Sequence, residues 1–195
     1  MMQNEIVGAM LTAPEKLQPF LSEALGTISN ADFPLDQKWP ELMPQLMQHM
    51  DSPDPAVVQA TLRTTHAISR KYRTASHTDE LWNEIAMVLN HTHDRLLATN
   101  QKCLAAMAAN AGNKAALEAV FSTLDLVARV FYDLNYQDIP ASFEDNLDIW
   151  MEGFRQLLTL PDPVKALFAT KNDDDEKLST MHQMQRRYDG CAHKP

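Results

Sequence analysis

Apolar residues recur along this chain at steps of three and four positions, which is the spacing of one face of an α-helix. None of the apolar segments alternates at a period of two, as a half-buried β-strand does. Every proline lies before residue 56 or after residue 139, so long helices fit between these positions. The pattern predicts helices over residues 39–50, 57–72, 81–96, 117–131 and 143–158.

Several residues predict where these helices begin and end. Asp54 precedes Pro55, which is typical of an N-cap followed by a proline in the first turn. Ser142 and Asp145 have the spacing of a capping box. Residues 110–113, with a glycine between asparagines, predict that one helix stops and another begins.

The predicted helices fall into pairs over about residues 14–51, 54–99 and 114–160. A repeat of about 40–47 residues with two amphipathic helices per unit is typical of HEAT or armadillo repeats. Segments 33–55 and 143–163 also share the order of their Phe, Trp, Leu and Pro-Asp-Pro residues. The sequence therefore predicts an all-α solenoid of about three HEAT-type repeats with flanking helices over residues 1–180, followed by a divergent tail at 181–195.

Composition and charge narrow the classes of function. The chain has 195 residues, 45% of them hydrophobic, and it is rich in Leu and Ala, which excludes a mainly β protein. Its 17 basic and 26 acidic residues give a net charge of −9, which disfavours nucleic acid and anionic membranes as partners. The acidic excess favours a basic protein partner, or it serves solubility alone. No apolar run approaches the roughly 18–20 residues of a membrane span.

No motif in the sequence predicts an active site, a cofactor or a metal site. A nucleophile elbow, a phosphate-binding glycine loop and paired cysteines are all absent. The strongest metal candidate is His91 with His93, but side chains two positions apart on a helix point in different directions. We expect Cys103 to be a buried hydrophobe rather than a reactive thiol, and His66 to be packed. The chain is therefore not expected to be an enzyme.

Two charged runs are candidates for partner binding. Asp173–Glu176 is acidic and would suit a basic partner, whereas Arg70–Arg73 is mostly basic and would suit an acidic one. For both runs the alternative is a solvated surface without a partner.

Longer stretches of the chain carry a family resemblance. A pattern near the third HEAT repeat of importin-β superfamily receptors is similar to DFPLDQKWPELM (32–43). The CAS-type exportins resemble this chain more specifically, in VVQATLRTTHAISRKYR (57–73), ELWNEIAMVL (80–89), VFYDLNYQDIPASFEDNLDIWMEGFRQLLTL (130–160) and the acidic NDDDE (172–176). The resemblance covers residues 5–180 almost without gaps.

The resemblance implies a right-handed superhelix of antiparallel helix pairs, in which the second helix of each pair faces the concave side. It also implies a nuclear transport receptor that binds Ran GTPase in its GTP form and importin-α. Such a receptor is expected in the nucleus and cytoplasm, including the nuclear envelope. We take the candidate contact residues from the polar faces of the helices predicted to be second in each pair. These are Glu41, Gln45, Gln48, Asn83, Glu84, Asp94, Asp148 and Glu152.

The resemblance also has limits. CAS-type exportins are several times longer than this chain, and the similarity is lost after residue 180, which indicates a fragment. We expect the apolar face near the N-terminus to lack its neighbouring repeat, so that the protein folds but aggregates. The alternative hypothesis is a HEAT-repeat scaffold without transport activity. The residues of this apolar face are Ile6, Val7, Met10, Leu11, Leu17, Phe20 and Leu21.

Overall fold

The computed structural model describes residues 2–14, 16–32, 34–168 and 184–187. These residues form helices and turns with no β-strand among them, which confirms the all-α prediction. The predicted tail at 181–195 lies largely outside the described residues. The named helices are α1 (Met2–Thr12), α2 (Gln18–Ala31), α3 (Leu35–Lys38), α4 (Leu42–Met47), the 3₁₀-helix η1 (Gln48–Asp51), α5 (Pro55–Ser69), the 3₁₀-helix η2 (Arg70–Arg73), α6 (Asp79–Ala109), α7 (Lys114–Leu134), α8 (Ala141–Glu144), α9 (Leu147–Leu158) and α10 (Asp162–Phe168).

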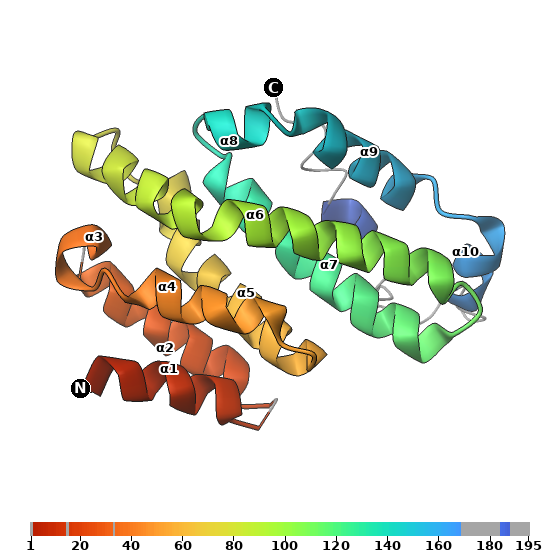
Figure 1. Ribbon diagram of the computed structural model, residues 1–195, viewed down its shortest axis with the longest axis horizontal. Coiled ribbons are helices and arrows are strands. Elements are labelled where there is room, and N and C mark those ends of the chain that lie inside the picture. The colour runs from red at the N-terminus through yellow and green to blue at the C-terminus, as the bar shows by residue number, and fades with distance from the viewer. Residues whose placement is uncertain (1, 15, 33, 169–183, 188–195) are drawn as a thin grey trace.

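The helices are arranged in two layers (Figure 1). Helices α1, α4, α6 and α9 contact one another in succession across one layer, and α2, α5 and α7 do so across the other. Hydrogen bonds show that α5 and α7 run parallel. Gln59 Nε2 donates to Thr123 Oγ1 (3.1 Å) in the first half of both helices, and Gln137 Nε2 donates to Ala75 O (2.8 Å) beyond their ends. Parallel equivalent helices are what a stack of repeats requires.

The pairing of the helices differs from the sequence-based prediction. Short connectors at 52–54 and 110–113 join α4 to α5 and α6 to α7, and the helices so joined pack on one another. The pairs are therefore α1/α2, α4/α5 and α6/α7, and the three predicted pairs are wrong by one helix. The turn-rich connectors lie inside pairs, whereas the longer segments 32–41 and 70–78 link successive pairs. Helices α1, α4, α6 and α9 form the first-helix layer, and α2, α5 and α7 form the second-helix layer.

The predicted N-cap at Asp54 and the predicted break between helices at 110–113 are confirmed, and the predicted capping box is wrong. Asp54 Oδ1 accepts a hydrogen bond from Ala56 N (2.9 Å), and Asn113 Oδ1 accepts one from Ala116 N (3.2 Å). The capping box at Ser142 is not formed, because this residue lies inside α8, and the N-cap of α8 is a proline without a side-chain cap. The helix begins after Pro140, two residues before Ser142, because the fixed φ of proline favours a helix start.

Two helices differ in extent from the prediction. Helix α6 has 31 residues and continues well past the predicted 81–96, because its apolar stripe extends through Leu104 and Met107. The helix predicted over 143–158 is divided into α8 and α9 at residues 145–146, an Asp-Asn pair of the kind that favours turns.

The hydrophobic core runs through both layers. Trp39 is buried just before α4 and Trp150 is buried within α9, so the tryptophans of the two segments of similar sequence both belong to the core. Leu126 and Val130 are buried on α7, as we expect for a helix that packs between neighbours on more than one side.

The apolar face near the N-terminus is smaller than predicted. Val7, Met10 and Leu11 are buried, so they contribute to the core rather than to an adhesive surface. Leu17 and Phe20, at the start of α2, are 51% and 73% exposed. The expected aggregation stays a prediction, and it rests mainly on these two side chains.

Candidate functional site

The predicted contact residues lie on or beside α4, α6 and α9, which belong to the first-helix layer. Their expected placement on second helices is wrong, and the cause is the shifted pairing. Gln45 is half-buried and Glu84 is buried, while the other six are exposed. The exposed positions are Glu41, Gln48, Asn83, Asp94, Asp148 and Glu152.

The prediction that Glu84 is an exposed contact residue is wrong. Its carboxylate accepts hydrogen bonds from Tyr72 Oη (2.8 Å) and Leu35 N (2.9 Å), and Lys71 Nζ lies 2.8 Å away. The Glu84 side chain is 0% exposed, so its carboxylate joins η2 and the start of α3 to α6 instead of reaching a partner. Burial, and secondly the charge of Glu84, raises the pKa of Tyr72 well above its ordinary value.

Asp148 and Glu152 line one groove of about 470 Å³ between α6 and α9. Gly153 lets the helices approach closely there, because a Cβ at this position would lie 3.1 Å from Leu104 Cδ1. A hydrogen bond from Arg155, with a smaller contribution from a neighbouring amide, lowers the pKa of Glu152 to about 2. At neutral pH the Glu152 carboxylate is ionised, and the guanidinium of Arg155 lies beside it.

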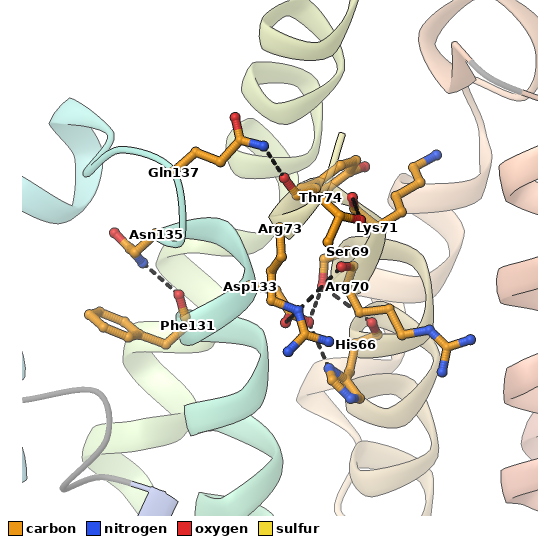
Figure 2. A network of polar contacts seen from close by, with 11 residues as sticks. His66, Ser69, Arg70, Lys71, Arg73, Thr74, Phe131, Asp133, Asn135 and Gln137 are labelled. Atoms are coloured by element: carbon orange, nitrogen blue, oxygen red, sulfur yellow. Dashed lines mark hydrogen bonds and ion pairs between the residues drawn. The ribbon is translucent and has the colours of Figure 1, made fainter. Parts of the chain in front are cut away.

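A polar network lies in the second-helix layer, where α5 and η2 meet α7 (Figure 2). At its centre is Asp133, whose side chain is buried. Asp133 accepts hydrogen bonds from His66 Nδ1 (2.6 Å) and Ser69 Oγ (3.0 Å), and Arg73 Nε lies 3.2 Å from its other oxygen. The network fixes η2 against α7, and it confirms that His66 is packed.

Ser, His and Asp also make up hydrolase triads, but the arrangement here is different. Ser69 Oγ contacts Asp133 and the backbone oxygen of His66 (3.5 Å), rather than the imidazole that would have to accept its proton. In the part of the chain that the structure describes, no three His, Cys, Asp or Glu side chains are arranged to hold a metal ion. No helix within that part has both the length and the apolar character to span a membrane.

His93, a candidate metal ligand, and Cys103, a candidate thiol, both pack against neighbouring side chains. His93 Nδ1 lies 2.9 Å from Asp94 Oδ1, and its ring packs edge-on against Phe143 at 4.9 Å between centroids. Cys103 is half-buried rather than fully buried, and it lines an apolar cavity of about 250 Å³. Burial raises the pKa of Cys103 to about 11, so the thiol stays protonated at neutral pH.

The surface of the second-helix layer carries arginines that the sequence pattern predicts only in part. Arg70 and Arg73 belong to the basic run predicted as a candidate patch, but Lys71 of the same run pairs with Glu84 on α6. Arg129 on α7 is not singled out, because the apolar periodicity assigns α7 to the core.

Comparisons with known proteins point to one family. The Cse1 family model matches residues 68–188. The chain is 36% identical over 176 residues to Exportin-2 of Danio rerio and of Homo sapiens, a match that covers 90% of this chain and 17% of theirs. A solved structure of the exportin Cse1 in its cargo-free, cytoplasmic state aligns with a TM-score of 0.84 and 31% identity, over 94% of this chain and 19% of that one. The chain therefore spans less than a fifth of the length of these relatives.

Proposed function

The chain belongs to the Cse1 family, and from this membership we propose that it acts as part of a nuclear transport receptor of the exportin type. The relatives that it matches are named as exportins rather than as enzymes, and the proposal includes no catalytic step and no cofactor. Its partners are Ran GTPase in the GTP form and importin-α. Its location is the nucleus and cytoplasm, including the nuclear envelope.

The second-helix layer is the proposed contact face. The family resemblance implies that second helices face the concave side, and the observed pairs make these helices α2, α5 and α7. The main support is the Asp133 network, which holds His66 of α5 and Arg73 of η2 in fixed positions at one end of this layer. The seven predicted positions that are not buried lie on the opposite layer, and their role in partner contacts stays a prediction.

Retention of purified partners on the immobilised chain tests this function. Importin-α and Ran locked in its GTP form are added separately and together, at low and at moderate salt, with Ran in its GDP form as the matched control. Because the chain spans 17% of the length of its relatives, it supplies part of an interface, and we expect clear retention only with both partners present. Raising the salt should weaken retention, since charged contacts are screened.

Retention of neither partner would contradict the transport role. The same fold would then be favoured as a HEAT-repeat scaffold without transport activity. Equal retention of the GTP and GDP forms of Ran would also contradict the proposal, because a transport receptor has to distinguish them.

A further inference from the structure

We propose that a patch of arginine and tyrosine side chains on the second-helix layer binds an acidic segment of a partner protein. The patch consists of Arg70, Arg73, Arg129, Tyr132 and Tyr136, and we call it the arginine–tyrosine patch. This inference rests on the proposed function for the identity of the contact face. It adds the chemistry of what that face binds.

Three side chains of the patch lie beside one another, and the other two flank them on η2 and α7. The guanidinium of Arg73 lies over the ring of Tyr132 at 5.9 Å from its centroid, and Tyr132 contacts Tyr136 edge-on at 5.4 Å between centroids. Arg129 is one helical turn before Tyr132 on α7. Figure 2 shows the Arg73 guanidinium at Asp133, whereas the Arg70 side chain, also from η2, points away from Asp133, and it pairs with Glu23. The patch therefore extends from η2 onto the last two turns of α7 and the residues just after it.

The arginines are both accessible and held in place. Their side chains are 40%, 36% and 34% exposed for Arg70, Arg73 and Arg129. Arg73 Nε lies 3.2 Å from buried Asp133, Arg129 Nε donates to Asp125 (2.8 Å), and Arg70 pairs with Glu23. A guanidinium has five N–H donors, so a second carboxylate can bind to an arginine that one acid already orients. Such preorganisation lowers the entropy lost on binding.

Each of the three guanidinium groups already faces one acid of the chain. The patch therefore offers oriented N–H donors rather than an excess of positive charge. Arg binds carboxylates in a planar, paired geometry, so these donors select carboxylates as the ligand groups. The net charge of −9 on the chain repels a polyanion as long as a nucleic acid.

The tyrosines indicate that the ligand is a protein segment. Tyr and Arg are, together with Trp, enriched at energetically important positions of protein interfaces. Tyr136 is 40% exposed, so its ring offers an apolar surface next to the guanidinium groups. An acidic segment with an aromatic or aliphatic residue among its carboxylates would contact both kinds of side chain.

Fluorescence anisotropy with the full chain tests the proposal. The probe is a short labelled peptide rich in Glu and Asp with one central Phe, and its control has Gln and Asn in place of the acids. The test variant is Arg70→Gln with Arg129→Gln, which removes two exposed charges and leaves Arg73 on Asp133. The matched control is Arg155→Gln, which removes an exposed arginine of the first-helix layer that also pairs with an acid. Circular dichroism confirms that all variants are folded.

We expect the acidic peptide to bind and the amide control to bind much more weakly. The double variant should weaken binding about tenfold, since charge-assisted contacts are lost, and Arg155→Gln should leave it unchanged. Tyr136→Ala should also weaken binding without altering its dependence on salt. Equal loss in the double variant and in Arg155→Gln would overturn the proposal, because attraction would then not be local.

Two other occupants give distinct results. Tighter binding of a single-stranded oligonucleotide than of the peptide would show that the patch recognises phosphates, and would overturn the protein assignment. A large gain in peptide affinity after Asp173–Glu176 is changed to the amides would show that the chain's own acidic run competes for the patch, and would overturn a partner in trans. Peptide binding with no retention of Ran or importin-α would support the patch and contradict the proposed transport role. Retention of Ran and importin-α with no peptide binding would support the transport role and overturn the patch.

Discussion

Removal of the buried carboxylate of Glu84 should strongly destabilise the fold. The side chain is fully buried and accepts from Tyr72 Oη and Leu35 N, with Lys71 Nζ 2.8 Å away. Glu84→Ala would leave a hydroxyl, a backbone N–H and an ammonium group without this acceptor. It would also leave a cavity where α6 meets η2 and α3.

The size of the effect follows from these partners. Breaking a buried ion pair by removing one partner costs about 3–5 kcal/mol. For a chain of this length, each kcal/mol lowers Tm by about 2–4 °C, so Glu84→Ala should lower Tm by about 6–20 °C. Glu84→Gln keeps the volume and one acceptor oxygen but loses the charge, and should cost roughly 1–3 kcal/mol.

Urea unfolding followed by far-ultraviolet circular dichroism measures the loss. The matched control is Asn83→Ala, one residue earlier on the exposed side of α6, which should change the free energy of unfolding by less than about 0.5 kcal/mol. The same small effect for Glu84→Ala and for Asn83→Ala would refute the buried network. The buried network would be supported if Glu84→Ala were less stable than Glu84→Gln and Glu84→Gln less stable than the wild type.

Three further measurements test other parts of the structure. Gly26→Ala should lower the free energy of unfolding in urea by roughly 1–3 kcal/mol, because its Cβ would lie 2.8 Å from a backbone oxygen of α5. Gly8→Ala, whose Cβ would have nothing within 4 Å, should raise it by about 0.5–1 kcal/mol. Equal effects of the two substitutions would contradict the close contact of α2 with α5. The pKa of Tyr72 is raised above its unfolded value of about 10, so stability should be full below that pH and fall as pH rises beyond it, and Tyr72→Phe should abolish this fall in urea midpoints. The pKa of Glu152, about 2, should return toward its ordinary range in Arg155→Gln, and an unchanged carboxyl titration by NMR would argue against their hydrogen bond.

The helical character and the positions of most helices could be predicted from the sequence because local rules determine them. The apolar period locates the helices, and the N-caps at Asp54 and Asn113 obey short-range hydrogen-bond rules. Pairing depends on which helices pack together, and periodicity does not contain that information. Proline, asparagine or aspartate occurs in the connectors inside pairs, at 52–54 and 110–113, but also in segment 32–41 between pairs. These residues therefore do not distinguish the two kinds of connector, and the predicted pairs are shifted by one helix.

The candidate site was less predictable, because burial of a polar residue depends on distant parts of the chain. Glu84 lies on the polar side of a simple helical projection, yet η2 and α3 cover it. Asp133 is buried for the same reason, since His66 and Arg73 reach it from sixty or more positions away along the chain. Exposed Asp148 and Glu152 were predictable, because α9 is strongly amphipathic and its polar face is solvated.

Hydrogen exchange tests the central claim, that partners contact the second-helix layer, most directly. Amide exchange of the free chain is compared with that of the chain saturated with importin-α and Ran in its GTP form. We predict added protection in η2 and the C-terminal turns of α5 and α7, with α4 and α9 unchanged. Protection confined to α4, α6 and α9 would contradict the account and return the contact face to the first-helix layer.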